Sequence, residues 1–303
     1  MVLRDFDELI RKVKDSGSPR RVVVAAAADE HSLEAVLRAQ KDGMVTPVLV
    51  GDKAKIAEAL SKLGASVPEQ DIYDAPEAEP AAAKAVSLVR EGKGDFLMKG
   101  KLETAQMLKP VVNKESGLGT GRLMSHFAFF QSPRYPKLLA IVDGGMVPYP
   151  TLEQKKAIIE SSVGVLKNLG YENPRVGVLA AIEKLNPKMP ETIDADALYR
   201  MNAEGEIKGC VVAGPISLDL ALDPEAAKIK GYHGNPVAGD ADVLVVPNIH
   251  TGNALGKSIL VLGGGLMAGF VMGARVPIIV TSRGASSEEK YLSLVLAAAS
   301  SKA

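Results

Sequence analysis

The chain lacks the cysteines for a disulfide, and it lacks a net charge. Cys210 is the single cysteine among 303 residues, which excludes an intrachain disulfide framework and fits a reducing cytoplasm. Two valines follow it, so we expect a small core residue rather than a reactive thiol. Thirty-six Lys and Arg residues balance thirty-six Asp and Glu residues. This balance excludes a general attraction to nucleic acid or to an anionic membrane, so any anion site must be local.

The chain is also poor in histidine, and no two histidines are paired. His31, His126, His233 and His250 have none of the spacings typical of metal ligands, and with one cysteine we expect no structural zinc site. His250, close to Asn253, either lines a ligand cleft or is an ordinary polar loop residue.

An uninterrupted hydrophobic run is missing as well. Residues 1–14 are charged and helical rather than apolar, so no secretory signal is expected and we predict a cytoplasmic protein. The most apolar stretch, residues 258–280, is interrupted by Gly263-Gly264-Gly265 and by Arg275, and Pro277 restarts it as a strand. We therefore expect a long buried helix rather than a membrane span.

What the chain has is an apolar fraction of 47% and a regular alternation of strand and helix patterns. This alternation predicts an α/β fold with mainly parallel sheets. Strands are expected at 21–27, 46–50, 95–98, 175–181, 211–213, 242–246 and 276–280, and helices at 29–40, 53–63, 80–90, 102–112, 152–169, 193–201, 223–230 and in the last residues of the chain. Two further strands, 125–130 and 137–142, follow too closely for a helical crossover and predict an antiparallel pair.

The length leaves room for two domains. Asp143-Gly144-Gly145, followed by two prolines, breaks the pattern, so we place a boundary there. Asp143 either positions an acid or belongs to a linker turn. Because residues 278–280 resemble the strands of the first half, we expect the last strand and helix to return to the first domain. The predicted domains are 1–143 with 281–303, and 144–280, with a cleft between them.

The last strand, 276–280, leads into a candidate anion-binding turn. Ser286 and Glu289 have the spacing of a capping box, so the following helix should begin at Ser286 or one residue later. Free N–H groups and the helix dipole would then face the carboxyl edge of the sheet. Arg283 would add a fork of donors and Ser282 a hydroxyl. The alternative is a solvated arginine beside a purely structural cap.

Lys99-Gly100-Lys101 follows the strand at 95–98 and is a second candidate anion turn. Without other support, two solvated lysines are the favoured interpretation. Residues 251–258 suggest a phosphate-binding P-loop, but Thr251 stands where its first glycine is needed. Gly263-Gly264-Gly265 lacks the spacing of a dinucleotide fingerprint.

Several segments together resemble the phosphate acetyltransferase and phosphate butyryltransferase family over nearly the whole length. They are Lys99-Gly100, Ser125-His126, Asp143-Gly144-Gly145, Gly214-Pro215-Ile216-Ser217-Leu218-Asp219, Asp242-Val243-Leu244-Val245-Val246-Pro247, Gly252-Asn253 and Ser282-Arg283-Gly284. The segment 214–219 and the compact size look closer to the butyryltransferase branch.

The resemblance implies reversible transfer of a short acyl group, butyryl or acetyl, between coenzyme A and inorganic phosphate, giving acyl phosphate. It implies two three-layer α/β domains like those of isocitrate and isopropylmalate dehydrogenases, with a cleft between them. It also implies a homodimer or larger homo-oligomer, acyl-CoA and phosphate as substrates, and no metal or bound organic cofactor.

The resemblance also assigns site residues. Ser282 and Arg283 would serve the active site, and Glu289 would be the base, with Glu288 as the neighbouring alternative. The acetyltransferases have Asp at the position of Glu289. The expected substrate-binding residues are Lys99, Thr104, Arg122, Gly252, Asn253 and Lys257. The butyryl branch often has Arg at the position of Gly119, and Arg122 could supply that charge.

Two functions from other classes stay open at this point. The departures at Gly119 and Glu289 fit a non-catalytic sensor that binds acyl phosphate or acyl-CoA. Fold analogy alone suggests a metal-dependent dehydrogenase, although no cluster of carboxylates is visible in the sequence.

Overall fold

A computed structural model describes residues 2–232, 234–282 and 284–301. Its contacts divide the chain into two compact units. Unit 1 comprises Met1–Phe6 and Leu123–Met267, and unit 2 comprises Asp7–Arg122 and Ala268–Ala303. The chain thus passes three times between units, after residues 6, 122 and 267, and the last two changes come earlier than the predicted boundaries after residues 143 and 280. The strands at 125–131 and 139–142 pair with each other, and the second of them also pairs in parallel with the strand at 243–245. Both strands before residue 143 therefore belong to unit 1.

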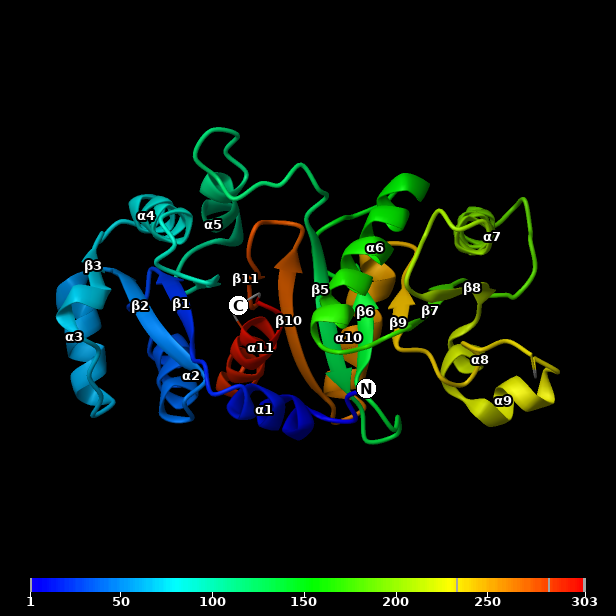
Figure 1. The fold of residues 1–303 in the computed structure, drawn as a ribbon, viewed down its shortest axis with the longest axis horizontal. Helices are drawn as coiled ribbons and strands as arrows, with labels where there is room; N and C mark the ends of the chain where they lie inside the picture. Colours follow the sequence, from blue (N-terminus) through cyan, green and yellow to red (C-terminus); the bar gives the residue numbers. More distant parts are fainter. Residues whose placement is uncertain (1, 233, 283, 302–303) are drawn as a thin grey trace. The chain divides into compact units, whose positions relative to one another are not determined.

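Unit 2 contains a mainly parallel sheet in the order β3-β2-β1-β4-β11-β10 (Figure 1). All of its pairs are parallel except β10 with β11. The strands are β1 (Arg20–Ala25), β2 (Val45–Gly51), β3 (Ile72–Asp74), β4 (Phe96–Lys99), β10 (Leu266–Met272) and β11 (Ile278–Ile279). Valines 22, 23 and 24 of β1 are fully buried. A strand apolar on both faces is what a parallel sheet covered by helices requires.

The helices of unit 2 follow from its strand order. Right-handed crossovers place α2 and α3 on one face of the sheet and α4 on the other, and α11 packs against α2. The helices are α1 (Phe6–Asp15), α2 (Glu30–Lys41), α3 (Lys53–Lys62), η1 (Glu69–Asp71), α4 (Ala78–Arg90), α5 (Thr104–Val111) and α11 (Ser287–Ser300). The predicted start of α11 is confirmed.

Unit 1 contains strands in the order β5-β6-β9-β7-β8. β5 (Ser125–Gln131) and β6 (Leu139–Val142) are antiparallel, as predicted, and the other pairs are parallel. Its other elements are α6 (Leu152–Asn168), β7 (Arg175–Leu179), α7 (Pro190–Ala203), β8 (Val211–Ile216), α8 (Leu218–Leu222), α9 (Pro224–Ile229), β9 (Val243–Val245) and α10 (Ile249–Val261). Crossover handedness places α6 and α10 on opposite faces of this sheet (Figure 1).

The prediction of one long helix ahead of the last strand is wrong. α10 ends at Val261, and residues 266–272 form β10. Three consecutive glycines separate the two elements, and Gly264 adopts a positive φ of 61°. Glycine has no side chain to stabilise a helix and readily takes this left-handed conformation, so the run ends the helix. Phe270 and Val271 then pack as buried strand residues.

Carboxylates tie together the amino ends of the strands in each sheet. In unit 1, Asp242 accepts hydrogen bonds from the backbone N of Arg175 (2.7 Å) and from Lys137 Nζ (2.5 Å). In unit 2, Asp95 accepts a hydrogen bond from the backbone N of Arg21 (2.7 Å). The buried ammonium of Lys137 is therefore paired. These amino ends are fastened by side chains, which leaves the carboxyl ends as the edges where function is expected.

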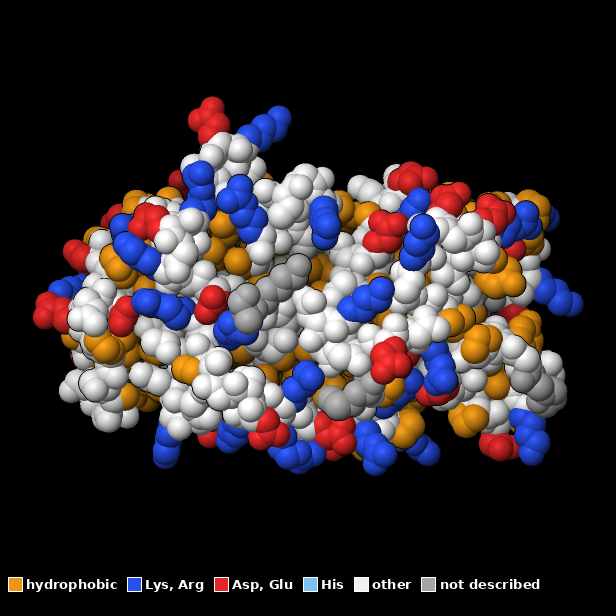
Figure 2. Space-filling model, in the orientation of Figure 1, with side chains coloured by type: hydrophobic (Ala, Val, Ile, Leu, Met, Phe, Trp, Pro, Cys, Tyr) orange, Lys and Arg blue, Asp and Glu red, His pale blue; other side chains and the backbone are white. Residues whose placement is uncertain are grey.

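The surface and the core agree with the composition. On the face shown in Figure 2, basic and acidic side chains are interspersed, so no large field of one sign is visible there. Cys210 is buried, as predicted, and burial raises the pKa of its thiol to about 11. Among the described helices, none is both long enough and apolar enough to span a lipid bilayer.

Candidate functional site

In unit 2, the backbones that follow the parallel strands β1 and β4 stay in close contact as they leave the sheet. The backbone N of Gly100 donates to Ala25 O (2.8 Å), and that of Lys101 donates to Ala26 O (3.0 Å). A Cβ atom at Gly100 would lie only 2.3 Å from Ala26 O, and Ala26 itself has a positive φ of 54°. Only glycine fits at position 100, so the close approach of two strand exits explains this residue.

Lys99 is the last residue of β4, and its side chain is buried. The residue is 7% exposed, and its Nζ donates to Leu102 O (3.0 Å). The interpretation as two solvated lysines is therefore wrong for Lys99, although Lys101 is exposed. A buried ammonium is expensive to desolvate, and here it lies at the carboxyl edge of parallel strands, where ligands bind in such sheets.

The turn after β11 leads directly into α11. Ser286 is the N-cap, and its side chain accepts a hydrogen bond from the backbone N of Glu289 (3.1 Å), as predicted. Ser282 is exposed, and its Oγ accepts a long hydrogen bond from the backbone N of Gly284 (3.4 Å). Arg283 lies outside the described residues, so its role stays a prediction.

The first turns of α11 are fastened to α2 by polar side chains. The contacts are Ser287 Oγ to Glu34 Oε2 (2.7 Å), the ion pair of Glu288 with Arg38, Lys290 Nζ to Asp29 Oδ2 and to Ser32 Oγ (both 3.2 Å), and Tyr291 OH to Asp42 Oδ2 (2.7 Å). Arg38 also lies over the ring of Tyr291, 3.6 Å from its centroid. Together these contacts hold one side of α11 against α2.

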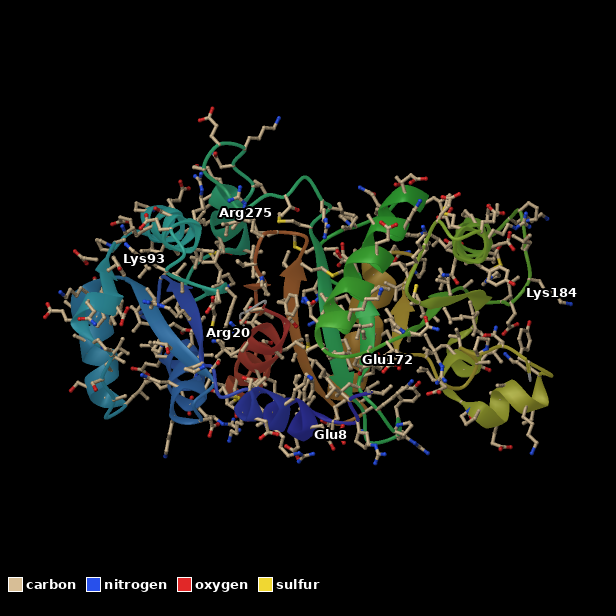
Figure 3. All side chains as sticks on the ribbon, in the orientation of Figure 1. Glu8, Arg20, Lys93, Glu172, Lys184 and Arg275 are labelled. Carbon is tan, nitrogen blue, oxygen red and sulfur yellow. The ribbon has the colours of Figure 1, made fainter. Side chains whose placement is uncertain are left out.

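Two more predicted substrate-binding residues of unit 2 are exposed. Thr104 is the first residue of α5, and Arg122 follows the glycine-rich stretch 117–121. Gly119 forms an isolated bridge with Ala274. The next residue, Arg275, donates its backbone N–H to Leu118 O (2.9 Å), and Figure 3 shows Arg275 close to α5. This stretch is therefore pinned to the β10–β11 turn.

In unit 1, the turn after β6 is organised by Asp143. Its carboxylate is 2% exposed and accepts hydrogen bonds from four backbone N–H groups. They belong to His126 (2.9 Å), Gly145 (2.7 Å), Met146 (2.8 Å) and Val147 (3.2 Å). Asp143 therefore shapes the turn, and the turn lies inside unit 1 rather than in a linker.

The amino end of α10 packs directly on this turn. A Cβ atom at Gly252 would lie 2.8 Å from Gly144 Cα, so the two backbones touch. Asn253 Nδ2 lies 3.5 Å from Gly144 O, and Lys257 is exposed one turn further along the helix. His250 Nε2 is 3.1 Å from the hydroxyl of Tyr149. The structure thus brings Gly252 and Asn253 to the carboxyl edge of the unit 1 sheet.

A further polar cluster in unit 1 was not predicted. Lys230 Nζ lies 2.9 Å from Glu183 Oε1, 3.0 Å from Asp219 Oδ2 and 3.2 Å from Ser217 Oγ. Hydrogen bonds from Ser217 and Lys230 lower the pKa of Asp219 to about 2. Ser217 and Asp219 lie within the segment 214–219 noted above. Glu183 and Lys230 had no local signal, because they meet that segment only in the folded chain.

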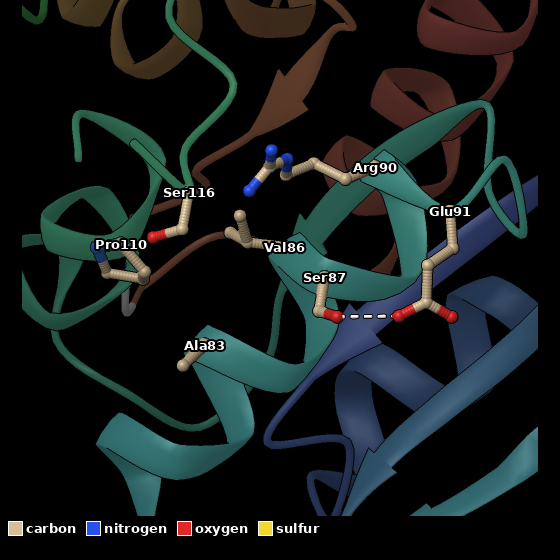
Figure 4. Close-up of a pocket in the computed structure, with 7 residues that line it drawn as sticks. All are labelled: Ala83, Val86, Ser87, Arg90, Glu91, Pro110 and Ser116. Carbon is tan, nitrogen blue, oxygen red and sulfur yellow. Dashed lines mark hydrogen bonds between the residues drawn. The ribbon is translucent and has the colours of Figure 1, made fainter. Parts of the chain in front are cut away.

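A surface hollow of about 350 Å³ lies between α4 and α5 (Figure 4). Its described lining is Ala83, Val86, Ser87, Arg90, Glu91, Pro110 and Ser116. Ser87 Oγ donates to the carboxylate of Glu91 (2.7 Å). None of these residues was predicted as a site residue. Within residues 2–232, 234–282 and 284–301, no group of three or more His, Cys, Asp or Glu residues could hold a metal ion.

The predicted residues thus fall into two groups, and all of them except Arg122, which adjoins the stretch pinned to the β10–β11 turn, lie at the carboxyl edge of parallel strands. Lys99, Thr104, Arg122, Ser282 and Glu289 belong to unit 2, and Gly252, Asn253 and Lys257 belong to unit 1. Cations, helix amino ends and hydroxyls at these edges are the groups that an α/β protein uses to bind anionic ligands.

Comparison with known proteins identifies the family. Residues 77–298 match the family model described as "Phosphate acetyl/butaryl transferase". The chain is 44% identical to the phosphate butyryltransferase of Clostridium acetobutylicum, over 98% of both chains. It is 42% identical to the phosphate acetyltransferase of Thermotoga maritima, over 97% of this chain and 98% of that protein. The crystal structure of a branched-chain phosphotransacylase from Enterococcus faecalis V583 is 31% identical, with a TM-score of 0.80 over 93% of this chain and 98% of that one.

The chain therefore belongs to the phosphate acetyl/butyryl transferase family. It is an acyltransferase of that family, which confirms the resemblance inferred from its motifs.

Proposed function

We propose that this protein catalyses reversible transfer of a butyryl or acetyl group between coenzyme A and inorganic phosphate, giving acyl phosphate. The observation that supports this most strongly is its near-full-length likeness to a phosphate butyryltransferase. The chemistry needs a base for the thiol of coenzyme A and several donors for phosphate. Both kinds of group are found among the predicted residues of unit 2.

In the proposed reaction, Glu289 accepts the proton of the coenzyme A thiol. A free thiol has a pKa of about 8.5, so a positioned carboxylate increases the fraction of thiolate at neutral pH. The thiolate sulfur attacks the acyl carbonyl carbon of acyl phosphate. The new carbon–sulfur bond forms, the carbon–oxygen bond to phosphate breaks, and inorganic phosphate leaves with that electron pair. The opposite direction runs through the same steps in reverse.

The structure favours Glu289 over Glu288 as this base. At about 100° per residue, Ser287, Glu288, Lys290 and Tyr291 all lie on the side of α11 that contacts α2. Glu289 lies about 180° from the centre of that side. The carboxylate of Glu288 is also paired with Arg38. Glu289 is thus the acidic residue of the first turn that is directed away from α2.

Donors for phosphate and for the developing oxyanion come from Ser282, Arg283, Lys99 and the amino end of α11. Preorganised donors of this kind stabilise charge in the transition state, and loss of one typically costs about 100- to 1000-fold in rate. We propose that the substrate-binding residues of unit 1, Gly252, Asn253 and Lys257, complete the site with Thr104 and Arg122 of unit 2. The two units would then be two three-layer domains with a cleft between them.

Coenzyme A acts as a substrate rather than a bound cofactor, and no metal takes part in the steps above. We further propose a homodimer or larger homo-oligomer in the cytoplasm. The comparisons give no support to a non-catalytic sensor, because the relatives are named as transferases.

The test is phosphate-dependent release of free coenzyme A from acetyl-, propionyl- and butyryl-CoA, followed with a thiol reagent. Release should require phosphate, and its rate should differ among the three acyl chains. Omitting phosphate controls for simple hydrolysis. No phosphate-dependent release from any of the three would overturn the proposed function.

A further inference from the structure

Lys290 is a buried cation placed where a cation is unfavourable. The residue is 7% exposed, and it follows closely on the N-cap of α11 at Ser286. Burial removes water from the ammonium group, and the amino end of a helix carries a positive partial charge. Both effects disfavour a lysine here, and an apolar residue would fill the space without either. A function beyond packing would explain its charge.

The ammonium is held by the N-cap of a second helix. Asp29 caps α2, and its carboxylate accepts hydrogen bonds from the backbone N of Ser32 (3.1 Å) and from Ser32 Oγ. Lys290 Nζ donates to both Asp29 and Ser32, at 3.2 Å in each case. Burial would raise the pKa of Asp29, but hydrogen bonds from Ser32 and the charge of Lys290 outweigh it and lower the pKa. The carboxylate of Asp29 is therefore the group that holds the Lys290 side chain in place.

Lys290, Asp29 and Ser32 form a triad that joins two helix amino ends at the carboxyl edge of the same sheet. α2 follows the end of β1, next to the close contact between Ala26 and Gly100. α11 follows the turn that contains Ser282. Because Lys290 is adjacent to Glu289 in the chain, a contact that fixes Lys290 also fixes the rotation of the first turn. The direction of the Glu289 side chain is then set by the helix.

We propose that Lys290 is a positioning residue for acyl transfer, which acts through its ion pair with Asp29 to hold Glu289 in its productive direction. This inference rests on the proposed function. It does not require Lys290 to touch either substrate. A displacement of about 1 Å at a reacting group can lower a rate by about 100-fold, so the loss of such a clamp should appear in kcat.

The experiment is a double-mutant cycle with Lys290→Met and Asp29→Asn, in which kcat and KM are measured for butyryl-CoA and phosphate. Asparagine still caps a helix well, so α2 keeps its N-cap. Each single variant should lose about 10- to 100-fold in kcat with little change in KM. The double variant should lose no more than the worse single variant, because all three lack the same ion pair. Additive losses would contradict action through Asp29.

Tyr291→Phe is the matched control. It removes a 2.7 Å hydrogen bond between the same two helices, one residue further along, but leaves the triad in place. It should lower the urea midpoint of unfolding while kcat is retained. If Lys290→Met likewise lowers only the midpoint and leaves kcat unchanged, its role is structural and the inference is overturned.

Two further outcomes are separable. If Lys290→Met does not fold, Ser32→Ala is the variant to test. It removes the hydroxyl that contacts both Lys290 and Asp29 but keeps the two charged side chains. An unchanged kcat in that variant would overturn the inference. If the unmodified protein shows no phosphate-dependent release of coenzyme A, the proposed function fails and the inference fails with it. If the unmodified protein and the variants are all fully active, the proposed function stands and only the inference about Lys290 fails.

Discussion

At the scale of single residues, the structure separates two neighbouring carboxylates. Glu288 forms a largely exposed ion pair with Arg38, and such pairs contribute about 0 to 1 kcal/mol to stability. Glu289 lies on the other side of the helix and is the proposed base. We expect Glu289→Gln to lower kcat by about 100- to 10,000-fold, the usual contribution of a general base, while Glu288→Gln keeps kcat. Steady-state assays on both variants decide this, and equal losses in the two would contradict the assignment.

The same scale gives a prediction for Cys210. Burial raises its pKa to about 11, above the usual thiol value of about 8.5. Below that usual value the thiol is neutral in both states and adds no pH dependence. As pH rises from about 8.5 toward about 11, the unfolded chain loses the proton first, so folding stability falls. At pH 8 a disulfide reagent should modify the native protein far more slowly than the protein in urea. Equal rates would show an accessible, ordinary thiol.

At the scale of elements, both sheets share one organisation. Their amino edges are tied by carboxylates such as Asp242 and Asp95, and their carboxyl edges by close backbone contacts such as that of Gly252 with Gly144. A Cβ atom at Gly252 would also lie 2.9 Å from Val246 Cγ2. We therefore expect Gly252→Ala to destabilise the fold by about 1 to 3 kcal/mol, as overpacking usually does.

Gly164 is the matched control for that change. It also lies inside a helix, α6, but a Cβ atom there would have no neighbour within 4 Å. Gly164→Ala should stabilise the protein by up to about 1 kcal/mol, because alanine favours the helix. Urea unfolding midpoints of the two variants should move in opposite directions. A lower midpoint for both would show that the glycine contact is not the cause.

At the scale of the whole molecule, the proposed substrate site draws residues from both compact units. A ligand that binds only the folded state stabilises it by about 2.7 kcal/mol at 100 times its Kd. If coenzyme A contacts residues of both units, it should raise the thermal transition of each. Differential scanning calorimetry with and without coenzyme A tests this. A shift confined to one of two resolved transitions would place the whole coenzyme site in a single unit.

The amino-acid sequence by itself determined the features that depend on local pattern. Buried apolar runs and caps such as Ser286 identified the α/β class, most strands and the start of α11, and ordered motifs identified the family. The break between α10 and β10 was also locally encoded, because three glycines end the helix, although the prediction did not use them.

Only the tertiary structure decided the features that depend on residues distant in sequence. Lys99 is buried at the end of β4, which pairs with β1 from far earlier in the chain. Asp143 accepts hydrogen bonds from four backbone N–H groups, and Glu183 and Lys230 meet Ser217 from separate segments. Because β6 pairs with β9, residues 123–142 belong to unit 1 rather than to the unit that precedes them in the chain. The proposal of Glu289 rather than Glu288 as the base likewise rests on the contacts of α11 with α2. Charge and burial are properties of surroundings, and the surroundings of these side chains are assembled only when distant strands and helices pack together.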